Sequence, residues 1–184
     1  MIQRVVLVGF MGAGKTSVGR LLAGRLGWQH ADLDRVIEER AGRSIPDIFR
    51  AGGESAFRTL EREATRQLAG RRRLVISPGG GWMTDPANRE ELAPGALFVY
   101  LKVSPDEVVR RVGNSLYPCR PLLEVDDPSA AARELLAARE PAYRRADLAV
   151  DTDGREIEEV VEEVAERLRR VGVLGDVDET GAKR

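Results

Sequence analysis

The sequence predicts one three-layer α/β domain with a five-stranded parallel sheet, and three observations support this fold class. The first is an alternation of short apolar runs with helical patterns along most of the chain. The second is a glycine-rich loop that joins the first apolar run to the first helical segment. The third is the length of 184 residues, which is enough for one well-buried core and short for two. Strands that alternate with helices favour a parallel sheet that helices cover on both faces.

The expected strands are short runs rich in aliphatic residues that alternate with helical segments. They lie at Arg4–Val8, Trp28–Ala31, Leu74–Ser77, Leu97–Leu101 and Leu148–Val150. Ligands of such sheets bind at the carboxyl ends of the strands. The segments expected at that edge are Gly9–Thr16, Asp32 with Asp34, Gly79–Gly81 and Lys102.

The first strand leads into the loop Gly9–Thr16, which has the spacing Gly-x-x-x-x-Gly-Lys-Thr. A loop of this kind points backbone N–H groups and the positive end of a helix dipole at one position, where a polyphosphate is stabilised. We expect Lys15 to reach the outer phosphates and the Thr16 hydroxyl to ligate magnesium. The alternative is an ordinary glycine-rich turn, but the complete motif in this setting favours a nucleoside triphosphate.

Two acidic residues, Asp32 and Asp34, follow the second expected strand. Residues two apart on an extended segment face the same side, so we expect both carboxylates to lie above the phosphate loop. One carboxylate can hold the magnesium shell through water while the other accepts a proton from an attacking hydroxyl. The alternative is that Asp34 only caps a helix expected at Arg35–Arg40.

Later helices are marked by their ends. Ser104 is expected to cap the helix Pro105–Val112, and an amphipathic helix is expected at Glu158–Arg170. Between the helices Pro105–Val112 and Ala130–Arg145 lies Asn114–Asp127, a loop long enough to predict a functional lid. The tail Gly175–Arg184 is polar and without pattern, and we expect it to be disordered.

Several arginines and glycines lie near this expected edge. Arg58 is near the start of a long helix, Arg120 is in the expected lid, and Arg139 precedes a proline expected to interrupt a helix. The planar fork of arginine suits carboxylate and phosphate groups. Gly79–Gly81 allow close approach of the backbone to a ligand, although a triple glycine is about as often a mobile turn. Taken singly, each of these signals is weak.

The amino-acid composition argues against binding to nucleic acid or to membranes. The chain has 42% hydrophobic and 32% charged residues, and its 29 basic and 30 acidic residues nearly cancel. No net field would draw it to nucleic acid or to an anionic membrane, so we expect small-molecule partners. A single cysteine, Cys119, excludes an internal disulfide and fits a reducing compartment. We therefore expect a cytoplasmic protein and a monomer, with Trp28 and His30 as packing and surface residues.

Taken together, these motifs resemble those of the shikimate kinases, from Arg4 to about Arg170. The segments that carry the resemblance are Gly9–Thr16, Asp32-x-Asp34, Gly42-Arg-Ser-Ile-x-x-Ile-Phe49, Gly53-Glu-x-x-Phe57-Arg58, Gly79–Gly81, Arg120-Pro-Leu-Leu123 and Arg139-x-Pro-x-Tyr143. The resemblance implies phosphorylation of the 3-hydroxyl of shikimate by ATP, with magnesium as cofactor. It also implies a P-loop kinase fold of residues 1–174, with a substrate-binding helical segment at about 33–61 and a lid at about 113–126.

The resemblance also implies a role for individual residues. Shikimate is bound by Asp34, Arg58, Gly79, Gly80, Gly81 and Arg139, and ATP by Gly12, Ala13, Gly14, Lys15, Thr16, Ser17, Arg120, Arg111 and Arg155. The catalytic residues are Lys15, Asp34 and Arg120, while Thr16 and, through water, Asp32 hold magnesium. Phe49 and Phe57 then lie near the substrate ring.

One segment departs from the family pattern, and two other functions stay open. The residues just before Arg120, including Tyr117-Pro118-Cys119, carry no basic side chain. A kinase of another small hydroxy acid, such as gluconate, would share the phosphate loop. A non-catalytic nucleotide-binding regulator is a third candidate, although Lys15, Thr16, Asp32, Asp34 and Arg120 are all present.

Overall fold

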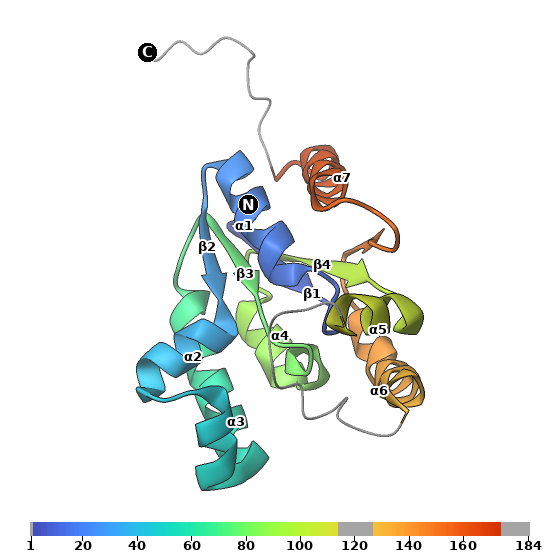
Figure 1. Cartoon of the computed structure of the whole chain (residues 1–184). Coiled ribbons are helices and arrows are strands. Elements are labelled where there is room, and N and C mark those ends of the chain that lie inside the picture. The colour runs from blue at the N-terminus through green and yellow to red at the C-terminus, as the bar shows by residue number, and fades with distance from the viewer. Residues whose placement is uncertain (1, 114–126, 174–184) are drawn as a thin grey trace.

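The computed structural model describes residues 2–113 and 127–173. The expected lid, with Cys119 and Arg120, and the expected tail therefore lie outside the described residues, apart from Asp127. Figure 1 shows a central sheet between helices, as the alternation of strands and helices predicts.

All five strands pair in parallel, in the order β2-β3-β1-β4-β5. They are β1 (Arg4–Val8), β2 (Gln29–Asp32), β3 (Leu74–Ser77), β4 (Ala96–Lys102) and β5 (Leu148–Asp151). The predicted five-stranded parallel sheet is confirmed, with strand limits shifted by at most one residue. β1 lies at the centre because its uninterrupted aliphatic sequence lets it be buried on both faces.

The helices are α1 (Lys15–Leu26), α2 (Leu33–Ala41), α3 (Ile45–Ala69), α4 (Pro86–Leu92), α5 (Pro105–Gly113), α6 (Pro128–Tyr143) and α7 (Ile157–Arg170), with a short 3₁₀ turn η1 (Trp82–Thr84). α1 packs against α7, and α3 packs against α4. α2 and α3 extend from the β2 side of the sheet, and α5 and α6 lie near the carboxyl end of β4 (Figure 1). None of the helices in the described ranges is long and apolar enough to cross a bilayer.

The helix ends follow the sequence signals with two exceptions. Ser104 accepts a hydrogen bond from the N–H of Glu107, so the predicted cap of α5 is confirmed. α3 bends at Gly53, whose φ of 65° and ψ of −167° are not helical, and a helical segment precedes the bend. The expected interruption at Pro141 is wrong, because α6 continues through it to Tyr143. A proline this close to the end of a helix removes one hydrogen bond without ending the helix.

The hydrophobic core lies between the sheet and the helices on its two faces. Its largest fully buried side chains include Trp82, Tyr143, Phe10 and Phe98. Phe10 and Tyr143 border the segments that the sequence predicts as functional, so the core reaches directly under the carboxyl edge of the sheet. That edge is consequently a rigid platform.

Candidate active site

The phosphate loop takes the predicted strand-loop-helix form between β1 and α1. Gly9, Gly12 and Gly14 have φ angles of 143°, 77° and 85°, which favour glycine. A Cβ on Gly9 would lie 2.4 Å from the carbonyl oxygen of Leu101, so the loop leaves β1 in contact with β4. α1 has no acidic residue in its first turn. Its N-terminus is thus an electropositive position, because the helix dipole there is not offset by an acidic side chain.

Lys15 and Thr16 lie at the start of α1. The ammonium of Lys15 donates to the carbonyl oxygens of Gly9 and Phe10, at 2.9 Å each, and so lies over the loop. The Thr16 hydroxyl donates to Oδ2 of Asp32 at 2.7 Å. The structure therefore brings together the two residues predicted at the magnesium position.

The loop is fixed from behind by a contact that the sequence did not indicate. Ser77, at the end of β3, donates to the carbonyl oxygen of Lys15 at 2.9 Å, and its Oγ lies 3.0 Å from Nε2 of His30. Since the Ser77 proton points to Lys15, Nε2 of His30 is the donor to Ser77. Gly19 packs on this pair, because a Cβ there would lie 2.5 Å from Oγ of Ser77. His30 is therefore more than a surface residue.

Asp32 and Asp34 reach the site by a different backbone route from the predicted one. α2 begins at Leu33, so Asp34 lies in its first turn rather than on an extended segment. The helix cap is Asp32, which accepts from the N–H groups of Asp34 and Arg35 at 3.1 and 3.4 Å. The expectation of an extended Asp32–Asp34 pair is wrong, and so is the alternative that Asp34 is the cap. A cap with Asp at this position satisfies donors that the first turn leaves unpaired.

Each glycine of Gly79–Gly81 faces one of the side chains predicted to bind the acceptor. The distance from the position that a Cβ would occupy on each glycine to the nearest side-chain atom shows how closely that side chain approaches the backbone. A Cβ on Gly79 would lie 3.0 Å from Oδ1 of Asp34, one on Gly80 would lie 3.5 Å from Nη1 of Arg139, and one on Gly81 would lie 2.7 Å from Nη2 of Arg58. Side chains from α2, α6 and α3 thus converge on one short loop. A larger residue at either end of the triple glycine would displace the Asp34 carboxylate or the Arg58 guanidinium.

Asp34 has the most perturbed environment in this group. Burial, with a further contribution from the negative charge of Asp32, raises its pKa from 3.8 to about 6. Its Oδ1 is buried and accepts no hydrogen bond from any described residue. A buried carboxylate oxygen without a donor is costly unless a bound hydroxyl completes it. The arrangement suits a ligand that carries hydroxyl groups and a reaction that needs a proton acceptor.

Arg58 is oriented by two glutamates of unequal burial. It donates to Glu61 at 2.8 Å and to Glu54 at 3.0 Å, and the Glu61 side chain is only 1% exposed whereas that of Glu54 is 69% exposed. Burial raises the pKa of Glu61, and the hydrogen bond from Arg58 opposes the rise. Glu61 is a partner of a predicted site residue that the sequence reasoning missed. Its spacing of three residues from Arg58 on a helix was the available signal.

Two stacked phenylalanines lie on one side of Arg58. The Arg58 guanidinium lies 5.4 Å from the centre of the Phe57 ring, and the ring of Phe49 stacks on that of Phe57 with centroids 4.9 Å apart. Phe57 is buried, but Phe49 is 41% exposed. Phe49 thus presents an exposed aromatic side chain one ring away from the arginine.

Arg111 links three elements beside the phosphate loop. Its guanidinium donates to the carbonyl oxygen of Gly12 at 3.0 Å, to Oγ1 of Thr152 at 3.1 Å and to Glu107 at 2.6 Å. The end of α5 is thus connected to the phosphate loop and to the loop after β5. The predicted ATP-binding residues Gly12 and Arg111 are in direct contact.

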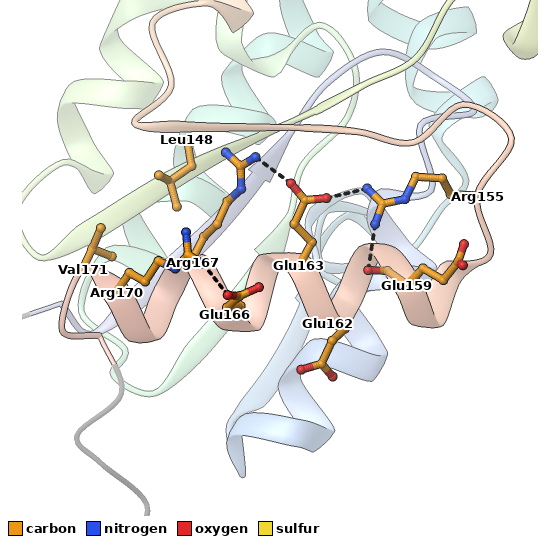
Figure 2. Close-up of a pocket in the computed structure, with 9 residues that line it drawn as sticks. All are labelled: Leu148, Arg155, Glu159, Glu162, Glu163, Glu166, Arg167, Arg170 and Val171. Carbon is orange, nitrogen blue, oxygen red and sulfur yellow. Dashed lines mark hydrogen bonds and ion pairs between the residues drawn. The ribbon is translucent and has the colours of Figure 1, made fainter.

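Arg155 lies elsewhere. Its guanidinium binds the Glu163 carboxylate at 2.5 Å and the carbonyl oxygen of Glu159 at 3.1 Å (Figure 2). It lines an open groove of about 880 Å³ along α7, which also contains Leu148, Glu162, Glu166, Arg167, Arg170 and Val171. Among the described residues, no other predicted site residue lines this groove. An ATP contact of Arg155 stays a prediction.

The side chains at the loop fit magnesium in one particular way. No group of three or more His, Cys, Asp or Glu side chains forms a metal cage in the described parts of the chain. A hydroxyl and a carboxylate, from Thr16 and Asp32, are adjacent. Magnesium usually keeps several waters and binds one or two protein ligands plus substrate phosphates, so this sparse oxygen set fits it.

Three comparisons with known proteins identify the family. The family model for shikimate kinase matches residues 11–169. A shikimate kinase from Thermus thermophilus is 49% identical over 166 residues, which are 90% of this chain and 90% of that protein. A solved structure of shikimate kinase from Acinetobacter baumannii in complex with shikimate has a TM-score of 0.86 and 35% identity, and covers 95% of this chain and 97% of that chain.

A solved gluconokinase from Sinorhizobium meliloti is also similar in fold. Its TM-score is 0.63 and its identity 21%, with 92% of this chain and 93% of that chain covered. At that identity the likeness concerns the fold alone.

Proposed function

The chain belongs to the shikimate kinase family, a family of ATP-dependent phosphotransferases. From this premise we propose that Asp34, Arg58 and Arg139, gathered on Gly79–Gly81, form the site that binds shikimate and presents its 3-hydroxyl to ATP. The observation that carries the proposal is the convergence of those three side chains, one on each glycine. They come from three different helices, so no local pattern accounts for their meeting.

In the acceptor half, charge complementarity fixes the orientation of shikimate. Shikimate carries one carboxylate and three hydroxyls. Arg58 and Arg139 bind the carboxylate, because guanidinium groups match its two oxygens. Asp34 binds ring hydroxyls through the oxygen that lacks a donor in the described structure. The opposite charges of the two ends allow only one direction of binding.

In the donor half, the phosphate loop binds the triphosphate of ATP. The N–H groups of Gly12–Ser17 and the N-terminus of α1 face the phosphates, and Lys15 turns from the loop carbonyls to the outer phosphates. Thr16 and, through water, Asp32 hold magnesium, which when bound neutralises phosphate charge. Arg120, in the predicted lid, adds a further cation, and Arg111 and Arg155 complete the predicted ATP contacts.

The chemical step is an in-line phosphoryl transfer. Asp34 accepts the proton of the 3-hydroxyl, the hydroxyl oxygen forms a bond to the γ-phosphorus, and the bond from that phosphorus to the bridging oxygen of ADP breaks. With a pKa near 6, Asp34 is ionised at pH 7. Its pKa is also close enough to the working pH for Asp34 to be an effective general base. Lys15 stabilises the charge on the transferred group. A cytoplasmic location, a monomeric state and closure of a lid at 113–126 stay predictions.

The test measures ADP release with ATP, magnesium and a panel of acceptors at equal concentration, including shikimate and gluconate. We expect shikimate-dependent release, and an increase of about 100-fold or more in the KM for shikimate in Arg139→Ala, because a charged hydrogen-bonding partner is lost. Arg144→Ala is the matched control, since Arg144 lies just after the same helix with its side chain 74% exposed. ADP release that is indifferent to shikimate, or a clear preference for gluconate, would overturn the assignment.

A further inference from the structure

Tyr143 is a buried polar residue next to the candidate active site to which the proposed reaction gives no role. It is the last residue of α6, and its side chain is fully buried. Its hydroxyl donates a hydrogen bond to the carbonyl oxygen of Gly80, 63 positions away in the chain. Gly80 is the middle residue of the loop on which the acceptor-binding side chains meet.

A second part of the proposed acceptor site lies close to the same hydroxyl. Arg139 lies one helical turn before Tyr143 in α6, and its positive charge is near enough to oppose the rise in the pKa of the Tyr143 hydroxyl. Nη1 of Arg139 also lies beside Gly80, 3.5 Å from the position of a Cβ there. One hydroxyl therefore contacts the glycine loop and lies near the arginine predicted to bind the shikimate carboxylate.

The ring of Tyr143 is held in place by the central sheet. It packs against the ring of Tyr100, with centroids 5.2 Å apart and an interplanar angle of 31°. Tyr100 lies in the middle of β4, next to the strand that carries the phosphate loop. Burial raises the pKa of Tyr143 to about 12, so its hydroxyl stays protonated and remains a donor at all physiological pH values.

We propose that Tyr143 is a positioning residue for the acceptor half of the site: its hydroxyl sets the distance and orientation of Gly80 and Arg139 relative to each other. This inference rests on the proposed function of the site. Without the hydroxyl, the Gly80 carbonyl loses its donor, and the loop beside which the Arg139 guanidinium lies is no longer tied to α6.

The phosphate loop keeps its own contacts to Ser77 and Asp32. Gly80 also borders the phosphate loop, since a Cβ there would lie 3.4 Å from the backbone nitrogen of Met11, but the loop's own contacts hold it in place. We therefore expect the larger effect on shikimate and the smaller one on ATP.

The test is Tyr143→Phe, with Tyr100→Phe as the matched control. Each variant removes one hydroxyl from the same ring pair and keeps the ring. We expect Tyr143→Phe to raise the KM for shikimate about tenfold, the effect of losing a hydrogen bond near a charged group, and to change the KM for ATP less than about twofold. Tyr100→Phe is expected to leave both constants within about twofold of the wild-type values. If Tyr143 only stabilised the fold, its substitution would change the KM values for both substrates together or for neither.

A double variant and a measurement on the wild-type protein complete the test. In an Arg139→Lys background, Tyr143→Phe is expected to have a smaller effect on the KM for shikimate, because the two residues act as a unit. The protein has three tyrosines, so labelling them with ¹³C at Cζ gives three NMR signals. We expect the Tyr143 signal to shift when shikimate is added and not when ADP is added, a result that does not depend on any variant folding.

The outcomes separate the two proposals. Suppose that the wild-type enzyme phosphorylates shikimate. If the KM for shikimate is then unchanged in Tyr143→Phe, or if Tyr143→Phe and Tyr100→Phe raise that KM equally, the role proposed for Tyr143 is wrong and the proposed function stands. An unchanged Tyr143 signal on addition of shikimate contradicts the role of Tyr143 in the same way. Failure of the wild-type enzyme to use shikimate would overturn both.

Discussion

Nη1 of Arg58 donates to Oε2 of the buried Glu61 at 2.8 Å, and this half-buried ion pair orients Arg58 toward Gly81. Glu61 is 1% exposed and lies one helical turn after Arg58 in α3. Asn88 lies 3.5 Å from the same glutamate oxygen. Arg58, a residue of the proposed acceptor site, therefore has one buried partner of opposite charge, Glu61, and one exposed partner, Glu54, which a ligand carboxylate could replace.

We expect Glu61→Gln to raise the KM for shikimate about tenfold or more and to destabilise the fold by up to about 3 kcal/mol, because a buried charge loses its partner. Glu54→Gln is the matched control, since Glu54 binds the same arginine from a side chain that is 69% exposed. We expect that variant to cost less than about 1 kcal/mol. Steady-state kinetics and urea unfolding measure the two effects, and equal effects of both substitutions would contradict the assigned role of Glu61.

The raised pKa of Asp34 predicts a pH dependence of activity. Because a protonated Asp34 cannot accept a proton, kcat/KM for shikimate should fall as the pH drops through about 6. Asp34→Asn should lower kcat by at least about 100-fold, the usual contribution of a general base. A pH-rate profile with its acidic limb near pH 4 would show that Asp34 is not the titrating base.

The raised pKa of Asp34 also predicts that stability changes with pH in the direction opposite to activity. The pKa of Asp34 is higher in the folded state than in the unfolded chain. Between pH 3.8 and about 6, the folded protein therefore holds a proton that the unfolded chain has released. The free energy of unfolding consequently declines as the pH rises through that range. The difference between 3.8 and about 6 corresponds to roughly 3 kcal/mol as an upper estimate. Asp34→Asn should therefore unfold at a higher temperature than the wild type at pH 7 and show no gain near pH 3. A lower melting temperature at pH 7 would contradict the burial argument.

Two glycines of α1 predict opposite outcomes for the same substitution. Alanine in place of an exposed helical glycine normally stabilises a protein by up to about 1 kcal/mol. We expect this for Gly24→Ala, because no atom outside the local helix lies within 4 Å of a Cβ there. Gly19→Ala should instead destabilise by about 1–3 kcal/mol, since its Cβ would lie 2.5 Å from the Ser77 hydroxyl. Thermal unfolding distinguishes the pair, and Gly19→Ala should also raise the KM for ATP by displacing Ser77 from Lys15.

Arg111 and Arg110 form a second matched pair. Both bind Glu107, and hydrogen bonds from Arg110 and then Arg111 lower the pKa of that carboxyl to about 2. Only Arg111 is recorded in contact with the carbonyl of Gly12 in the phosphate loop. We expect Arg111→Gln to raise the KM for ATP about tenfold with little change for shikimate, and Arg110→Gln to change neither by more than about twofold. Substrate titrations of both variants check this, and an effect on shikimate alone would contradict it.

Signals local in the chain predicted a large part of this protein. Alternating apolar runs predicted the parallel sheet, because each strand must be followed by a helix that returns the chain to the same end. The spacing of Gly9–Thr16 predicted the phosphate loop, which depends only on a strand, a turn and a helix that are contiguous. Asp34, Arg58 and Arg139 could be named in advance because each lies within a short motif.

Other features depended on contacts between distant segments. Asp34 was expected on an extended segment but lies in the first turn of α2, because whether Leu33 begins a helix is decided by its burial in the core as well as by its neighbours. Arg155 was expected at ATP and is bound to Glu163 on α7. A single sequence contains many Arg and Glu residues at helical spacing, so the partner of each is not marked.

The sequence by itself determined the fold class and the phosphate loop, since these follow from short-range pattern and connectivity, and its resemblance to a family supplied the proposed acceptor-binding side chains. Only the tertiary structure decided how those side chains are held. The Ser77–His30 contact spans 47 positions and the Tyr143–Gly80 contact spans 63. Such pairs form when strands and helices pack, because packing alone brings a buried donor to the one acceptor that would otherwise be left without a partner.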